Sequence, residues 1–219
     1  MKLDDKVYFY PERGMLDCNT YVITGEITVV IDPGLEQFLP ELIQDMRRDG
    51  LDPQDIAFIV NTHLHLDHYW ADEALKRQSR AKILLHPLQR QFYQTTVVET
   101  SRFFGLAPVE VQEDELLPDR LDVGDLEFEV LPTPGHSPDS LCFYCRSEGI
   151  LICGDLVFSH STGRVDLPGG SAGELKQSIE SIAQLDIDLL LPGHMSPIKG
   201  RENIQHNFEF VRQQVFPWL

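Results

Sequence analysis

Positive charge is scarce in this sequence: 18 Lys and Arg residues stand against 35 Asp and Glu residues, for a formal net charge of −17 at pH 7. This excess of negative charge repels phosphate backbones, so we expect no nucleic-acid partner. No apolar run reaches the roughly 18 residues of a membrane-spanning helix, so we expect no membrane partner. Residues 1–6 contain no apolar signal-peptide core, and we therefore expect a cytoplasmic protein.

Linkers rich in Ser, Gly and Pro, which often join separate domains, are also missing from this chain. We therefore predict that residues 1–219 form a single domain. Hydrophobic residues make up 42% of the chain and charged residues 24%, which is typical of a soluble globular protein. A chain of this length can bury a substantial core.

Cysteine is rare as well, with four residues in the whole chain. Two of them, Cys142 and Cys145, have the C-x-x-C spacing of a zinc or redox motif. Residues 140–145 are typical of a strand, however, and strand positions three apart point to opposite faces. We therefore interpret this pair as buried or half-buried thiols that do not share a metal ion.

Histidine, by contrast, is concentrated in residues 62–68, which read Thr-His-Leu-His-Leu-Asp-His. Imidazole nitrogens and carboxylate oxygens are the donors that bind Zn²⁺ and Fe²⁺ in proteins. The apolar, β-branched run 56–60 before this stretch predicts a buried strand, and residues 69–77 after it favour a helix. The candidate ligands therefore lie on a strand-to-helix loop at the edge of a sheet, where α/β proteins carry their chemistry.

Other segments of the chain give a mixed pattern of strands and helices. We predict strands at residues 21–23, 27–31, 82–86, 126–131, 141–146, 150–153 and 188–191, and helices at 38–48, from 87, at 172–185 and at 201–216. Residues 99–118 have no clear period; they are either a flap over a cleft or an ordinary packed surface loop. The order of elements indicates two packed sheets with helices outside them.

Four segments share one pattern: a strand ends, a small or turn residue follows, and a candidate ligand appears. Besides the His-rich loop, these segments are Pro134-Gly135-His136, Gly154-Asp155 and Pro192-Gly193-His194. Each Gly-His or Gly-Asp pair is weak evidence alone. Loops at strand ends can converge on one edge of a sheet, so the four together predict a metal site there.

The pattern H-x-H-x-D-H, followed by G-H-S, G-D and G-H, resembles the metallo-β-lactamase superfamily over residues 19–197 or so. The resemblance implies an α/β fold, a four-layer αβ/βα sandwich of two mixed β-sheets flanked by helices. It also implies two divalent metal ions, Zn²⁺ in the first instance and Fe or Mn as alternatives. By match with the family, one ion is held by His63, His65 and His136, the second by Asp67, His68 and His194, and Asp155 bridges them.

Two features narrow the resemblance within the superfamily. True β-lactamases lack the carboxylate bridge that Asp155 would supply, which disfavours antibiotic hydrolysis. Residues 162–171 resemble the glyoxalase II (hydroxyacylglutathione hydrolase) and persulfide dioxygenase branches, in which a basic residue contacts the thiol carrier of the substrate. Arg164 is therefore the candidate substrate-binding residue, and a structural salt bridge with Asp166 is the alternative.

Two departures from those branches affect the expected substrate. Only about 25 residues follow His194, too few for the C-terminal helical extension with which glyoxalase II commonly binds glutathione. Relatives usually have small residues after the Asp-His pair, whereas this chain has Tyr69 and Trp70. These aromatic rings either reshape the pocket or pack beneath it.

The resemblance implies a metal-dependent hydrolase, and we expect a small-molecule thioester or similar activated ester as substrate. Two divalent ions lower the pKa of a bridging water, and the resulting hydroxide attacks the substrate carbonyl. Asp67 is the candidate catalytic residue because its carboxylate can accept the proton. The alternatives are an iron-dependent persulfide dioxygenase that uses His63, His136 and Asp155, a lactonase, and a metal-binding domain without activity. The sequence is compatible with a monomer or a homodimer.

Overall fold

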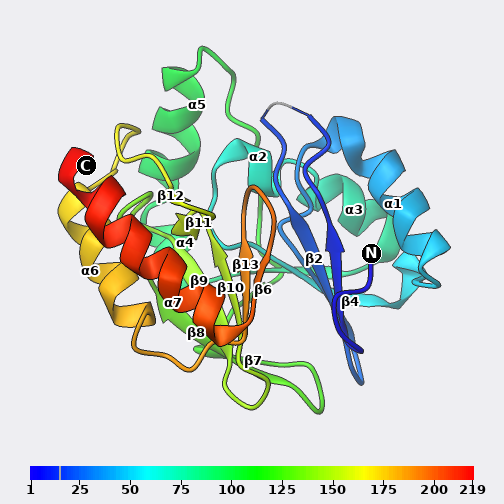
Figure 1. Cartoon of the computed structure of the whole chain (residues 1–219). Helices are drawn as coiled ribbons and strands as arrows, with labels where there is room; N and C mark the ends of the chain where they lie inside the picture. The colour runs from blue at the N-terminus through cyan, green and yellow to red at the C-terminus, as the bar shows by residue number, and fades with distance from the viewer. Residues whose placement is uncertain (15) are drawn as a thin grey trace.

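The computed structural model describes residues 1–14 and 16–219, and in these the chain forms two six-stranded sheets packed face to face. Helices cover the outer face of each sheet, which gives four layers (Figure 1). The predicted αβ/βα sandwich of two mixed sheets flanked by helices is therefore confirmed. No helix in the described residues is long and apolar enough to cross a membrane.

The first sheet has the strand order β1-β2-β3-β4-β5-β6. Its first three strands pair antiparallel and the last four pair parallel. The strands are β1 (Val7–Tyr10), β2 (Thr20–Thr24), β3 (Thr28–Ile31), β4 (Ile56–Val60), β5 (Lys82–Leu85) and β6 (Glu115–Leu116). We did not expect β1 from the sequence; it is an edge strand that pairs with β2.

The second sheet has the order β14-β13-β10-β9-β8-β7, with one parallel pair, β10 and β13. Its strands are β7 (Arg120–Asp122), β8 (Glu127–Pro132), β9 (Leu141–Cys145), β10 (Ile150–Gly154), β13 (Leu189–Pro192) and β14 (Ile198–Lys199). A small hairpin of β11 (Val157–Phe158) and β12 (Ser161–Thr162) follows β10.

Helices cover both outer faces and the loops near the strand ends. Around the first sheet they are η1 (Glu36–Phe38), α1 (Leu39–Arg48), η2 (Pro53–Asp55), α2 (Leu66–Tyr69), α3 (Asp72–Ser79), α4 (Pro87–Gln91), the π-helical η3 (Gln94–Glu99) and α5 (Thr100–Phe103). Around the second they are α6 (Ala172–Ile182), α7 (Arg201–Phe210), the π-helical η4 (Val211–Val215) and η5 (Phe216–Trp218).

Successive side chains of the central strands point to opposite faces of each sheet, and this alternation builds the layers. In β3, Ile31 packs into the core between the sheets, whereas Val30 packs against the outer helices. In β10, Ile152 likewise packs into the core between the sheets, and Leu151 packs against the outer helices. All four side chains are fully buried, and burial of each contributes about 1.5–3 kcal/mol. Strands that are buried on both faces form a rigid frame for the loops at their ends.

The two cysteines with C-x-x-C spacing follow the same alternation. Cys142 lies in the outer core under α6 and α7, and Cys145 lies in the core between the sheets. The expectation of buried thiols on opposite faces of a strand is therefore confirmed. All four cysteines are buried and free of disulfide bonds.

Two predicted helices differ in detail from the structure. The helix predicted for residues 69–77 is divided, because α2 begins inside the His-rich motif at Leu66 and the chain turns at Trp70 before α3. The helix predicted for residues 201–216 is α-helical to Phe210 and then changes to π and 3-10 turns. Residues 99–118, expected as a flap or a packed surface loop, contain α5 and the short edge strand β6.

Candidate metal centre

The structure brings all seven sequence-predicted ligands together at one edge of the sandwich. They follow strands of both sheets: two lie in the loop after β4, two in α2, and one each after β8, β10 and β13. Donor atoms within 4.8 Å of one another form three groups, which are His63-His65-His136, His63-His68-Asp155 and Asp67-His68-His194. Loops that are far apart in sequence thus supply one compact cluster.

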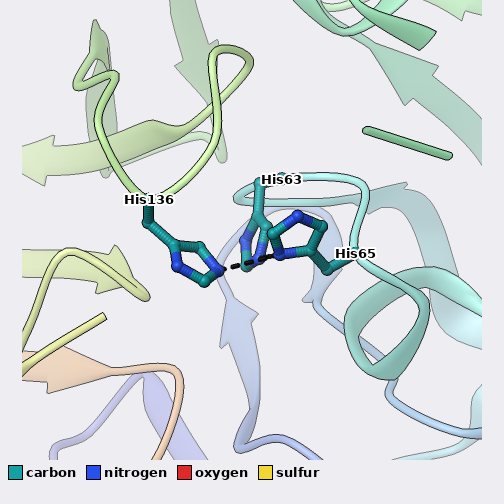
Figure 2. Close-up of side chains that lie close together, drawn as sticks. All are labelled: His63, His65 and His136. Atoms are coloured by element: carbon teal, nitrogen blue, oxygen red, sulfur yellow. Dashed lines mark hydrogen bonds between the residues drawn. The ribbon is translucent and has the colours of Figure 1, made fainter. Parts of the chain in front are cut away.

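We call His63, His65 and His136 the tri-histidine group (Figure 2). The Nδ1 atom of His65 lies 3.1 Å from Nε2 of His63 and 2.8 Å from Nε2 of His136. Burial disfavours the charged rings: it lowers the pKa of His65 to about 3 and also lowers the pKa of His63 and of His136. These imidazoles are therefore neutral at pH 7, which is the form that binds a metal ion.

We call Asp67, His68 and His194 the mixed group because it combines a carboxylate with two imidazoles. Asp67 Oδ2 lies 3.3 Å from His194 Nε2 and 3.7 Å from His68 Nε2. Burial opposes the charged form of His194, but Asp155 and Asp67 outweigh it and raise the pKa of His194 to about 11. Burial is likewise outweighed at His68, where nearby carboxylates raise the pKa well above its ordinary value.

The carboxylate of Asp155 lies between these two groups. Its Oδ2 is 3.5 Å from Nε2 of His136 in the tri-histidine group and 3.4 Å from Nε2 of His194 in the mixed group. Its Oδ1 is 3.4 Å from Nε2 of His68. Although burial disfavours the ionised form, His194 and His68 hold the pKa of Asp155 well below its usual range. A single anion therefore faces donors of both groups.

Unpaired buried atoms show that this cluster fits cations. Among the described residues, His68 Nε2 and Asp155 Oδ1 are buried side-chain atoms that face the cluster and have no hydrogen-bond partner. A polar atom that is buried and unpaired is costly, and a cation between His68 and Asp155 would satisfy both. Glycine is required beside them, because a Cβ at Gly193 would lie 2.2 Å from Asp155 Oδ1. Neutral imidazoles and carboxylates are also a suitable donor set for Zn²⁺, Fe²⁺ or Mn²⁺.

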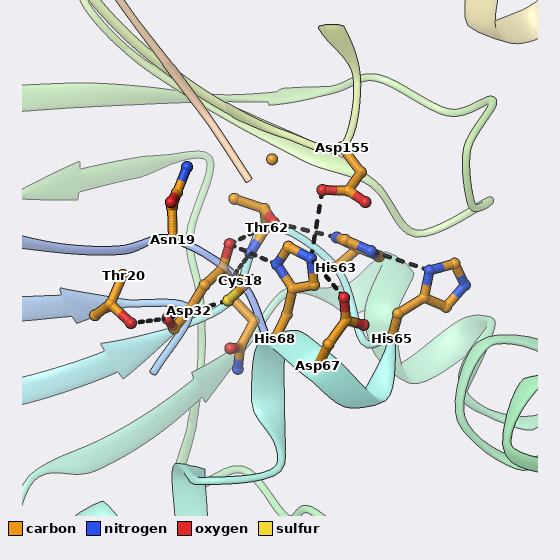
Figure 3. Close-up of polar contacts among 12 residues, drawn as sticks. Cys18, Asn19, Thr20, Asp32, Thr62, His63, His65, Asp67, His68 and Asp155 are labelled. Atoms are coloured by element: carbon orange, nitrogen blue, oxygen red, sulfur yellow. Dashed lines mark hydrogen bonds and ion pairs between the residues drawn. The ribbon is translucent and has the colours of Figure 1, made fainter. Parts of the chain in front are cut away.

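Hydrogen bonds at the far side of the rings fix their orientation. His68 Nδ1 donates to Asp32 Oδ2 over 3.0 Å, and the hydroxyl of Thr62 donates to the same oxygen over 2.7 Å (Figure 3). The Thr62 hydroxyl in turn accepts from Nδ1 of His63 over 3.2 Å. Because these partners bind Nδ1, the Nε2 atoms of His63 and His68 are left to face the cluster. Asp32 thus orients one ring directly and a second through Thr62.

His136 and His194 are oriented in the same way by other partners. His136 Nδ1 donates to the carbonyl oxygen of Arg164 over 2.7 Å, and His194 Nδ1 donates to Glu12 Oε2 over 2.9 Å. Sequence reasoning missed Asp32, Thr62 and Glu12 as supporting residues. The only signal was the Asp-Pro-Gly turn at residues 32–34, directly after the strand predicted at residues 27–31.

Arg164 has both of the features that we considered from the sequence. It lines a cavity of about 970 Å³ that opens beside the cluster. Its guanidinium also forms two hydrogen bonds with the Asp166 carboxylate, at 2.6 and 2.7 Å. Both side chains of this salt bridge are at least half exposed, so the pair contributes little to stability.

The two aromatic residues after the Asp-His pair have different places. Tyr69 is buried in the core under α1 and α3, and its hydroxyl donates to the carbonyl oxygen of Val109. Trp70 lines the cavity. One ring therefore packs beneath the site and the other shapes it. His160 packs against Phe210 instead of lining the cavity.

Comparison with known proteins supports a metal-dependent hydrolase. A probable metallo-hydrolase of Methanocaldococcus jannaschii is 31% identical over 80% of this chain and 86% of its own length. The hydroxyacylglutathione hydrolase GloC of Haemophilus influenzae is 32% identical over 76% of this chain and 79% of its own length.

Solved structures agree with the fold. The B3 metallo-beta-lactamase BLEG-1 superposes with a TM-score of 0.78 at 28% identity, over 97% of this chain and 100% of its own. The protein TTHA1623, solved in a di-iron-bound form, superposes with a TM-score of 0.72 at 30% identity, over 93% of this chain and 97% of its own. The family model of the metallo-beta-lactamase superfamily matches residues 13–194. The chain belongs to the metallo-beta-lactamase superfamily.

Proposed function

We propose that this protein hydrolyses a thioester or a similarly activated ester with the help of two divalent metal ions, Zn²⁺ in the first instance. The observation that carries the proposal is the position of Asp155, whose Oδ2 faces the tri-histidine group and the mixed group at 3.5 and 3.4 Å. A carboxylate between two sets of neutral or neutralisable imidazoles is suited to bridge two cations.

In this proposal the seven cluster residues hold the ions. His63, His65 and His136 would hold one, Asp67, His68 and His194 would hold the other, and Asp155 would be available to both. Two bound cations would supply Lewis acidity, which polarises a substrate carbonyl and makes a coordinated water more acidic. The protein's own contribution is to aim the Nε2 atoms by the hydrogen bonds of Asp32, Thr62 and Glu12, so that no reorganisation is needed during the reaction.

Asp67 is the proposed proton acceptor. Its side chain lines the cavity, so it can reach a water molecule beside a bound substrate. Although burial disfavours the ionised form, His68 and His194 lower the pKa of Asp67, which is therefore a carboxylate at neutral pH. A carboxylate at the cavity wall can take the proton of the attacking water and pass it to the leaving thiolate.

The name of the GloC relative, a hydroxyacylglutathione hydrolase, supports thioester hydrolysis for this chain. The rival dioxygenase would need His63, His136 and Asp155 to hold one iron ion. Across the described residues, the three groups of converging donors do not include that set. The likeness to BLEG-1 makes a β-lactam a necessary comparison substrate, although Asp155 disfavours that activity.

The test is a panel of assays on protein stripped with a chelator and reloaded with zinc, iron or manganese. Substrates are a hydroxyacylglutathione, a neutral acyl thioester, a lactone and a cephalosporin, and an oxygen electrode follows consumption with glutathione persulfide. We expect thioester cleavage that is lost on stripping and returns with two metal equivalents. Oxygen uptake with the persulfide, without cleavage of any thioester, would overturn the proposal.

A further inference from the structure

The cavity beside the metal cluster is large and mostly apolar. Its volume is about 970 Å³, at the upper end of the range for sites that hold drug-sized ligands. Eight apolar side chains line it: Leu16, Leu35, Leu66, Trp70, Phe104, Leu106, Phe158 and Leu167. A small hydroxyacyl group would leave most of this surface in contact with water.

The apolar residues come from several separate segments that surround the cluster. Leu66 and Trp70 lie in and directly after α2, beside Asp67. Phe104 and Leu106 follow α5, and each leaves close to half of its surface exposed, at 48% and 44%. Large apolar side chains held at the mouth of a cavity are costly in water, and burial by a ligand would remove that cost.

Charge at the cavity wall is already compensated. Outside the metal cluster, Glu36 and Arg164 are the charged side chains among the described lining residues. Asp166 binds the Arg164 guanidinium through two hydrogen bonds, and Arg77 lies 3.7 Å from the Glu36 carboxylate. The wall therefore offers far more apolar surface than free charge to a substrate.

From this lining we infer that the substrate carries a large apolar group, alkyl or aryl, on one side of the bond that is cleaved. This inference rests on the proposed hydrolysis of an activated ester and names its substrate class. The apolar group lies against Trp70, Phe104 and Leu66, and the reacting carbonyl lies at the metal cluster. An octanoyl or phenylacetyl thioester has this chemistry, as does an acetyl ester of a long-chain thiol.

Binding can be measured without turnover because the chain has two tryptophans. Trp218 is 88% exposed near the C-terminus and does not line the cavity, so Trp218→Phe leaves Trp70 as the sole tryptophan reporter. The probes are two uncharged thioethers, N-acetyl-S-octylcysteamine and N-acetyl-S-ethylcysteamine. We expect the octyl compound to change Trp70 fluorescence and to bind at least 50-fold more tightly. Equal affinities, or no response of Trp70, would overturn the inference.

Kinetics then distinguish the two halves of the substrate. One arm extends the acyl group on N-acetylcysteamine from acetyl to octanoyl, and the other extends the thiol of an acetyl thioester to octyl. We expect kcat/KM to rise about fourfold per added methylene in one arm until the cavity is filled. The arm that responds identifies the half that carries the apolar group, and a flat profile in both arms contradicts the inference.

Variants link the chain-length dependence to the cavity. Trp70→Ala and Phe104→Ala should each flatten that dependence, so that kcat/KM no longer rises with chain length. Trp218→Ala is the matched control and should leave the profile unchanged. If no thioester is cleaved but the octyl thioether still binds at Trp70, the proposed function fails alone. If thioesters are cleaved without any length preference, only the inference about the apolar group fails.

Discussion

The tri-histidine group and the mixed group lie side by side, yet they differ in charge and in what orients them. The tri-histidine rings are neutral, and the Nδ1 partners of His63 and His136 are the hydroxyl of Thr62 and the carbonyl of Arg164. The rings of the mixed group donate to the carboxylates Asp32 and Glu12. The first group is therefore ready to accept a cation, whereas the second must first release protons.

The largest expected effect comes from removing the charge that the two groups share. Asp155→Asn keeps the shape of the side chain but removes the anion that faces both groups at about 3.5 Å. We expect hydrolysis to fall by at least about 100-fold and one of two metal equivalents to be lost on dialysis. Metal content by mass spectrometry and kcat on the same preparation test this.

Asp119→Asn is the control for that variant because the Asp119 side chain is 97% exposed and lies outside the cluster. It should match the wild type in turnover and metal content. If Asp155→Asn retains full turnover and two tightly held ions, Asp155 does not bridge the two groups.

The next largest effect distinguishes Asp32 from Glu12, the two carboxylates that orient histidine rings of the mixed group. Asp32 is buried and accepts hydrogen bonds from His68 and from the hydroxyl and backbone N–H of Thr62, so Asp32→Asn should destabilise the fold by about 3 kcal/mol. Metal affinity should fall about 10- to 100-fold. Glu12 is partly exposed, and Glu12→Gln retains an acceptor for His194, so its effects should be under about tenfold.

Urea unfolding and metal titration of both variants measure this difference. If both variants lose the same stability and the same metal affinity, burial does not determine how much a carboxylate that orients a histidine ring contributes. Asp5→Asn is a matched control, because it removes an exposed ion pair with Lys2 far from the cluster.

The third effect is a pH dependence that separates the two groups. In the metal-free protein, the raised pKa values of His68 and His194, about 11 for the latter, keep both rings protonated at neutral pH. Metal binding to the mixed group therefore releases protons and weakens as pH falls, by up to about tenfold per unit for each proton. Binding to the tri-histidine group should change little between pH 6 and 8, because the pKa of His65 is about 3.

Isothermal titration with zinc at pH 6, 7 and 8 tests this comparison. We expect two classes of site, of which the weaker one strengthens as pH rises. Two sites with the same pH dependence would contradict the assignment of protons to the mixed group alone.

The smallest effect on stability is expected at Arg164. Because its salt bridge with Asp166 is exposed, Arg164→Ala should leave Tm nearly unchanged. If the guanidinium also binds the substrate, kcat/KM for a thioester with an anionic carrier should fall about 10- to 100-fold. The kcat/KM for a neutral thioester should not change. A large fall in Tm with normal turnover of the folded fraction would assign Arg164 a purely structural role.

The sequence was sufficient to predict the parts of this centre that are local. Each predicted ligand follows an apolar strand and a turn residue, as His136 and His194 illustrate, so strand prediction places them at one edge. The supporting contacts are not local: Glu12 and His194 are 182 residues apart. The different places of Tyr69 and Trp70 also depend on tertiary packing, because Tyr69 packs into the core under α1 and α3 whereas Trp70 lines the cavity.

The most direct test is a crystal structure of the protein, purified without added metal and then fully loaded with metal ions. Anomalous scattering at the zinc, iron and manganese edges identifies and counts the bound ions. We expect two ions, each about 2.0–2.3 Å from the donors of one group, with Asp155 in contact with both. A single ion held by His63, His136 and Asp155, with Asp67 and His194 more than about 6 Å from any metal, would contradict the two-metal centre.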